Sequence, residues 1–163
     1  MNPTRFGELI QLLSAGQVEF IVIGGVAAAL HGSAHLTFDL DVLYRRTGEN
    51  LARVAAALRP VHPYLRGAPA GLPFALDPPT LARGLNFTLT TSLGDVDLLG
   101  EVAGGGTYDQ LYSESEEATL YEVKVRVVSL RRLIALKRAA GRPKDFDMLA
   151  GLEALLEERE RQT

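Results

Sequence analysis

VEFIVIGGVAAALHGSAHLTFDLDVLY, residues 18–44, carries the most information about how this chain folds. Residues 18–23 are mostly β-branched or aromatic, which predicts a short strand, and Gly24 and Gly25 end this run. Helix-forming residues follow at 26–30, so the pattern predicts a strand, a tight turn and a short helix. Two adjacent glycines let the backbone approach a ligand closely, and the start of a helix favours an anion such as a triphosphate.

The second half of this stretch places two aspartates on one face of a strand. Residues 37–44 alternate, with Thr37, Asp39 and Asp41 on one face. The apolar side chains of the other face are Phe38, Leu40 and Val42. Two carboxylates this close repel each other unless a cation lies between them, and oxygen ligands suit Mg²⁺ or Mn²⁺ better than zinc. We therefore expect Asp39 and Asp41 to hold one or two divalent metal ions.

Taken singly, a GG pair is usually only a turn and a D-x-D strand is often a solvated face. Together, their order and spacing resemble the nucleotidyltransferase superfamily, specifically its small branch related to AbiEii-type toxins, with a GG turn, an HG step and a T-x-D-x-D strand. The matching residues are Gly24, Gly25, His31, Gly32, Thr37, Asp39 and Asp41. The resemblance implies an α+β, polymerase β-like fold, in which a small mixed sheet is flanked by helices. Relatives commonly have an arginine where this chain has His35, so that arginine's contact with phosphate is not carried over.

The composition indicates one globular domain over residues 1–163, with a core at about 1–112 and a C-terminal strand and helices at about 118–160. The chain is 47% hydrophobic, but no apolar run approaches the ~20 residues of a membrane span, and the N-terminus lacks a signal-peptide pattern. It contains no cysteine, which excludes disulfides and zinc–thiolate sites. We therefore expect a cytoplasmic protein with no membrane partner.

Two helices and a long loop are predicted around the opening motif. Residues 4–15 and 49–58 carry apolar side chains at helical spacing, so together with the strands they predict a βαβαβ-like beginning. Residues 60–83 hold six of the eight prolines, which predicts a loop without regular structure. This loop either covers the substrate side of the site or wraps rigidly over the core.

A third carboxylate is expected on a neighbouring strand. Residues 85–91 and 95–99 alternate and are joined by a turn, which predicts a hairpin with Asp95 and Asp97 on one face. Asp95 borders the turn, where aspartates commonly cap their own backbone, whereas Asp97 lies inside the strand and needs a partner. We therefore expect Asp97 to complete a catalytic and metal-binding set with Asp39 and Asp41, and the resemblance implies the same.

The C-terminal third is predicted to follow a glycine-rich linker, residues 104–106, with a strand at 121–128 and helices at 129–140 and 143–159. Its last part also resembles the AbiEii-like branch, at Lys137, Arg142, Lys144 and Asp145. The resemblance implies that Lys137 contacts nucleotide phosphates and that Asp145 assists the site. The alternative is that Lys137 only extends from an apolar face and Asp145 only adds charge at a helix start. The expected nucleotide-binding residues are Gly24, Gly25, Thr37, Lys137 and Asp145.

Residues 123–144 contain eight basic side chains and no acidic one, although the net charge of the chain is only −3. These basic residues are Lys124, Arg126, Arg131, Arg132, Lys137, Arg138, Arg142 and Lys144. Such a segment is either a solvated helix face or a surface that contacts RNA phosphates.

The resemblance implies Mg²⁺-dependent transfer of a nucleoside monophosphate from an NTP to a hydroxyl. The acceptor could be an RNA, a protein or a small molecule, and the chain could act in a toxin–antitoxin pair with a cognate protein. The alternative is a non-catalytic nucleotide- or protein-binding module, an antitoxin-like partner that retains the fold, and His35 is its main support.

Overall fold

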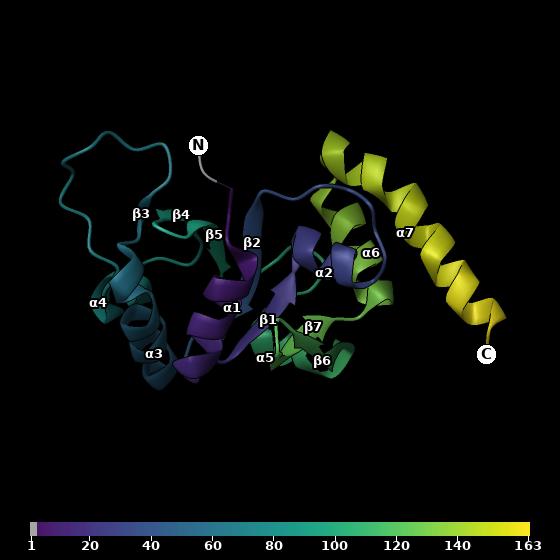
Figure 1. Cartoon of the computed structure of the whole chain (residues 1–163), viewed down its shortest axis with the longest axis horizontal. Helices are drawn as coiled ribbons and strands as arrows, with labels where there is room; N and C mark the ends of the chain where they lie inside the picture. The colour runs from purple at the N-terminus through teal and green to yellow at the C-terminus, as the bar shows by residue number, and fades with distance from the viewer. Residues whose placement is uncertain (1–2) are drawn as a thin grey trace.

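The computed structural model describes residues 3–163, and its centre is a seven-stranded mixed sheet of order β3-β4-β5-β2-β1-β7-β6 (Figure 1). The strands are β1 Phe20–Ile23, β2 Asp39–Tyr44, β3 Tyr64–Leu65, β4 Phe87–Thr91, β5 Gly94–Leu99, β6 Ser115–Leu120 and β7 Val123–Val128. The helices are α1 Phe6–Ala15, α2 Gly24–Leu30, α3 Gly48–Leu58, α4 Pro78–Arg83, α5 Tyr108–Leu111, α6 Leu130–Ala140 and α7 Pro143–Arg161. The mixed α and β class is as predicted, but the sheet is larger than the small one expected.

The elements follow in the predicted βαβαβ-like order, β1-α2-β2-α3-β3, but strands β1 and β2 pair antiparallel. The register pairs Ile23, the last residue of β1, with Asp41, near the start of β2. Helix α2 has only seven residues and is about 10 Å long. The chain therefore re-enters the sheet as β2 at the same end at which β1 finished. The parallel neighbours are instead β5 beside β2 and β7 beside β1.

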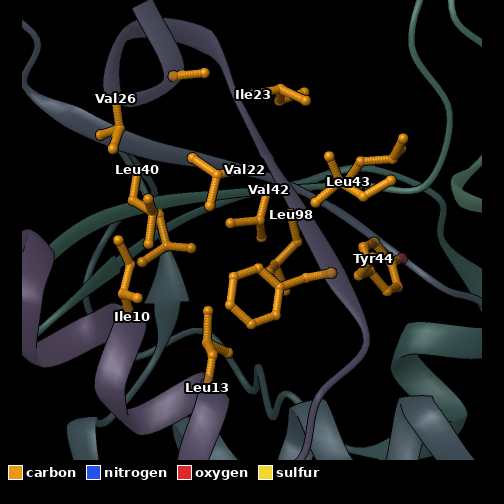
Figure 2. Close-up of a cluster of buried hydrophobic side chains, with 14 of the residues drawn as sticks. Ile10, Leu13, Val22, Ile23, Val26, Leu40, Val42, Leu43, Tyr44 and Leu98 are labelled. Carbon is orange, nitrogen blue, oxygen red and sulfur yellow. The ribbon is translucent and has the colours of Figure 1, made fainter. Parts of the chain in front are cut away.

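The core on one face of the sheet fixes the orientation of β2. Ile10 and Leu13 of α1 pack toward the sheet beside Leu40 and Val42 of β2 (Figure 2). All four side chains are at most 1% exposed. Because successive strand residues point to opposite faces, burying these leucine and valine positions turns the intervening aspartates to the other face.

Helices α6 and α7 form the C-terminal layer, and α7 lies along the outer side of α6 (Figure 1). Ser129 caps α6 by accepting a hydrogen bond from the Arg132 amide, and Gly141 ends it in the left-handed conformation, with φ 65°. The predicted bounds of α6 agree with the structure to one residue, and α7 runs two residues beyond its predicted end. None of the helices in residues 3–163 combines the length and hydropathy that crossing a bilayer requires.

The proline-rich segment is more regular than predicted. It contains the short strand β3, which pairs with β4, and the helix α4, whose first turn holds Pro78 and Pro79. Asp77 caps this helix by accepting from the Thr80 amide at 2.9 Å. Proline fits the first turn of a helix because the backbone N–H groups of that turn have no acceptor inside the helix. A proline cluster can therefore mark the start of a helix as well as the end of one.

Strand β6 is absent from the sequence prediction, which placed one strand at 121–128. Tyr121 and Glu122, with φ 49° and 70°, form instead the turn between β6 and β7. Neither residue is the glycine or asparagine that usually indicates such a turn. Strand β6 is also polar and largely exposed, so it lacks the apolar alternation of a half-buried strand. The segment 104–106, predicted as a linker, leads directly into α5.

Candidate metal and nucleotide site

The structure brings Asp39, Asp41 and Asp97 together on the sheet face opposite α1. Strands β2 and β5 are parallel, and their register sets Asp41 directly beside Asp97. One carboxylate oxygen from each of the three residues lies within 4.8 Å of the others. All three side chains are partly buried, so they face each other with limited access to water.

Asp95 lies on the same face but outside the cluster of Asp39, Asp41 and Asp97. Its carboxylate is 3.3 Å from the Nε atom of Arg66, and its amide donates to the Thr4 hydroxyl at 3.0 Å. The preference for Asp97 as the third member of the cluster therefore agrees with the geometry. The reason given for that preference was that Asp95 caps its own turn. In the structure Asp95 instead forms an ion pair with Arg66.

Burial and mutual repulsion raise the pKa values of two members of the cluster. Burial, followed by repulsion from Asp39 and Asp97, raises the pKa of Asp41 to about 8. Burial and the neighbouring Asp97 also raise the pKa of Asp39, against the opposing charges of Arg66 and Lys144. Three carboxylates converging on one point could hold a divalent cation that takes oxygen ligands, and such a cation would offset their repulsion.

The raised pKa of Asp41 predicts that the metal-free protein loses stability as the pH rises. The carboxyl group is protonated in both states below about pH 4, and between about pH 4 and 8 only the folded state keeps the proton. We expect the free energy of unfolding in EDTA to fall by about 4 kcal/mol between pH 5 and 8.5. Urea titrations across this range measure it. A flat or rising profile in wild type, or the same fall in Asp41→Asn, would contradict the assignment.

The glycine turn packs directly against this cluster. Gly24 has φ 66°, and a Cβ atom there would lie 2.0 Å from the Oδ2 atom of Asp41. A Cβ atom on Gly25 would lie 2.4 Å from the Thr37 hydroxyl, which donates to the Asp39 carbonyl at 3.2 Å. The two glycines therefore let β1 and α2 approach the acidic strand β2, and the hydroxyl of Thr37 holds the start of β2.

Phe38 was expected in the core but is 74% exposed, because β2 begins one residue later.

Lys137 and Asp145 form a buried ion pair behind the cluster. Asp145 is 0% exposed and accepts from Lys137 Nζ at 3.3 Å and from Arg142 Nε at 2.8 Å. Burial alone would raise the pKa of Asp145, but the hydrogen bonds from Arg142 and Lys137 outweigh it and hold the pKa below its usual range. Lys137 also opposes the raised pKa of Asp41, so its charge reaches the cluster. Asp145 therefore orients Lys137 and Arg142.

A cavity of about 240 Å³ joins the two groups. The charged side chains that line it are Asp41, Glu101, Lys137, Arg142 and Asp145. Its apolar side includes Leu99, Val102, Leu133, Leu136 and Ala140. The cavity thus offers cationic side chains beside the acidic cluster and an apolar wall next to them, which suits a ligand with both an anionic and a flat apolar part.

Arg66, in the proline-rich segment, was missed by the sequence interpretation. Its guanidinium group lies beside three carboxylates, those of Asp39, Asp95 and Asp97. The only signal in the sequence is a basic residue directly after the apolar pair Tyr64 and Leu65, which becomes β3. Nothing local indicates that this short strand extends the sheet on the side of the acidic face.

Most of the basic segment is neutralised within the protein. Six of its residues lie in ion pairs with acidic side chains: Lys124, Arg131, Arg132, Lys137, Arg138 and Arg142. Arg126 donates to Ser115 and to the Tyr112 carbonyl. Within residues 3–163 Lys144 makes no ion pair or side-chain hydrogen bond, and its charge acts on Asp39.

The two histidines near the glycine turn differ in environment. His31 is 4% exposed; its Nε2 atom is 2.8 Å from the Val128 carbonyl, and its Nδ1 atom is 3.1 Å from Arg159 Nη2. The HG step therefore ties α2 to β7 and α7. His35 lies on the exposed loop before β2, where its amide donates to the Ser33 hydroxyl at 3.2 Å.

A solved structure with a similar fold is a protein from Thermotoga maritima for which nucleotidyltransferase activity has been proposed. The TM-score is 0.52 at 15% sequence identity, and the match covers 94% of this chain and 91% of the other. No protein-family model matches the sequence. No curated protein matches it either. The likeness shows a shared fold over nearly the whole chain.

Proposed function

We propose that this chain is a metal-dependent nucleotidyltransferase that moves a nucleoside monophosphate from an NTP to a hydroxyl group. The observation that carries the proposal is the convergence of Asp39, Asp41 and Asp97 beside a cavity that Lys137 and Arg142 line. An acidic cluster alone would support only metal binding. The adjoining cationic side chains supply a place for the phosphates of a nucleotide, and the apolar wall supplies a surface for its base.

In this proposal Asp39, Asp41 and Asp97 would hold Mg²⁺ or Mn²⁺, which when bound stabilises charge on the phosphate oxygens. Asp97 accepts the proton of the acceptor hydroxyl, whose oxygen attacks the α-phosphorus. The bond from the α-phosphorus to its bridging oxygen then breaks, and pyrophosphate leaves. Lys137 and Arg142 orient the departing phosphates, and Asp145 holds these two side chains in place.

The test is incubation with each NTP, labelled at the α-phosphate, together with Mg²⁺ or Mn²⁺ and one acceptor class at a time. Total RNA, total protein and a panel of hydroxyl-bearing antibiotics cover the three kinds of acceptor. We expect label to enter one class with release of pyrophosphate, and no label with Asp41→Asn. Absence of transfer to all three classes over hours, from protein shown to bind NTP, would refute the proposal.

Replacing Lys137 by methionine should raise KM for the NTP by about 10- to 100-fold, because a charge-assisted contact to phosphate contributes about 1.5–3 kcal/mol. Methionine keeps most of the apolar stem, and Arg142 remains to pair with the buried Asp145. Steady-state kinetics measure the effect. The matched control is Lys124→Met, which removes an exposed ion pair with Glu117 and should leave KM unchanged. Equal KM values in the two variants would remove Lys137 from the nucleotide site.

The acceptor is proposed to be an RNA or a protein, because residues 3–163 form one domain, in which no second lobe encloses a small molecule at the cavity. The AbiEii-like resemblance further suggests a toxin–antitoxin pair with a cognate protein. The ion pairs of the basic segment weaken its expected role as a continuous RNA surface, since Arg131 and Arg132 already bind Glu160 and Glu114. Lys144, near Asp39, is the basic residue best placed to meet an RNA end.

The second candidate function is a non-catalytic nucleotide-binding module, favoured by His35 at the position where relatives commonly carry arginine. Calorimetric titration with each NTP and Mg²⁺ separates the two. Binding without pyrophosphate release in any acceptor mixture supports the module, whereas pyrophosphate release that depends on Asp41 eliminates it.

A further inference from the structure

Arg66 is fixed at both ends beside the acidic cluster. Its backbone amide donates to the Thr88 carbonyl at 3.0 Å, which continues the pairing of β3 with β4. Its Nη2 atom donates to the Leu89 carbonyl at 2.7 Å and to Asp97 Oδ1 at 2.9 Å. Because a carbonyl of the sheet holds the guanidinium group, its position is set by the fold as well as by the aspartates.

The remaining nitrogen atoms of Arg66 face two other carboxylates. Nε lies 3.3 Å from Asp95 Oδ2 and is buried, with no hydrogen bond of good geometry within residues 3–163, while Nη1 lies 3.7 Å from Asp39 Oδ2. Asp41 is not among the ion-pair partners of Arg66 and lines the cavity with Lys137. Arginine therefore contacts two of the three candidate metal ligands, and a lysine approaches the third.

These contacts have two opposing consequences for a divalent ion. A fixed positive charge a few ångströms from the ligands repels the ion and competes for Asp97 Oδ1, which weakens binding. The same hydrogen bonds hold Asp97 in one orientation, which favours the step in which this carboxylate accepts a proton.

We propose that Arg66 is a positioning residue of the transfer site, which orients Asp97 for proton transfer and lowers the intrinsic metal affinity of the cluster by its fixed charge. The inference rests on the proposed function. It predicts that metal binding and turnover respond in opposite directions when the arginine is removed.

The experiment compares wild type, Arg66→Ala and Arg66→Lys, with Arg83→Ala as a control from the same segment. Arg83 is exposed, and among the described residues its side chain donates a hydrogen bond only to the Thr80 hydroxyl. Calorimetric Mn²⁺ titration of the protein without nucleotide gives the dissociation constant, and transfer from labelled NTP gives kcat and KM. Urea unfolding in EDTA shows that each variant is folded.

We expect Arg66→Ala to bind Mn²⁺ about tenfold more tightly than wild type and to lose at least about tenfold in kcat. Arg66→Lys keeps the charge but cannot bridge Leu89 and Asp97, so its Mn²⁺ affinity should stay near wild type while kcat falls. Unchanged or weaker Mn²⁺ binding by Arg66→Ala, or an unchanged kcat in both variants, overturns the inference. Wild-type protein that binds no Mn²⁺ and transfers no nucleotide overturns the proposed function itself, which is a different result.

Discussion

Asp41→Asn should abolish nucleotide transfer, with a loss of at least about 1,000-fold in kcat/KM, and should stabilise the metal-free fold at the same time. Asparagine retains the shape of the side chain but removes its charge. In the proposed site that charge holds a divalent ion. Without an ion the charge is unfavourable, because burial and the neighbouring carboxylates raise the pKa of Asp41 to about 8. We expect the free energy of unfolding at pH 8.5 in EDTA to increase by about 4 kcal/mol.

Two assays on this one variant should therefore change in opposite directions. Labelled transfer measures the loss of activity, and urea unfolding in EDTA measures the gain in stability. Asp147→Asn is the control, because Asp147 is an exposed aspartate of α7 outside the cluster, and it should change neither quantity. Full activity in Asp41→Asn would remove this residue from the metal site, and a destabilised metal-free variant would show that the carboxylate has a favourable partner when no metal is bound.

Gly24→Ala should be the most damaging change of a single atom in the site. A Cβ atom would meet Asp41 Oδ2 at 2.0 Å, and the backbone has φ 66°, a conformation that alanine adopts at a cost of about 1 kcal/mol. Either the glycine turn or the carboxylate must move. We expect the free energy of unfolding to fall by about 2–4 kcal/mol and the Mn²⁺ affinity to fall at least about tenfold.

Gly48→Ala is the matched control, because Gly48 starts α3 with nothing within 4 Å of its would-be Cβ atom. That variant should retain Mn²⁺ affinity and stability to within about 0.5 kcal/mol. Urea unfolding and calorimetry on the two variants measure the difference. A Gly24→Ala protein that matches Gly48→Ala in both assays would show that the close approach of the turn to Asp41 is not needed.

The sequence predicted the acidic face because a strand repeats every two residues. With Leu40 and Val42 in the core, Asp39 and Asp41 had to share the opposite face, and the hairpin pattern did the same for Asp97. The side-by-side pairing of Asp41 with Asp97 was an expectation about neighbouring strands that periodicity alone does not fix. It depends on the parallel register of β2 and β5, which the whole sheet determines.

The features that the sequence did not predict depend on contacts between distant segments. The antiparallel direction of β2 depends on where the chain re-enters the sheet after α2. The edge strand β6 forms because it pairs with β7. Arg66 is 31 residues from Asp97, and its role depends on two residues of β3 extending the sheet past β4. None of these carries a local pattern, whereas the helices at 6–15, 48–58 and 130–140 do.

A crystal structure with Mn²⁺ and a non-hydrolysable NTP analogue, in which anomalous scattering locates the metal, would show directly whether the three aspartates form a metal and nucleotide site. We expect Mn²⁺ bound by Asp39, Asp41 and Asp97, with the phosphates of the nucleotide against Lys137 and Arg142. Asp41→Asn crystals treated in the same way should show no Mn²⁺ at these residues. Nucleotide bound elsewhere on the protein, or Mn²⁺ absent from the three aspartates of the wild type, would contradict the proposed site.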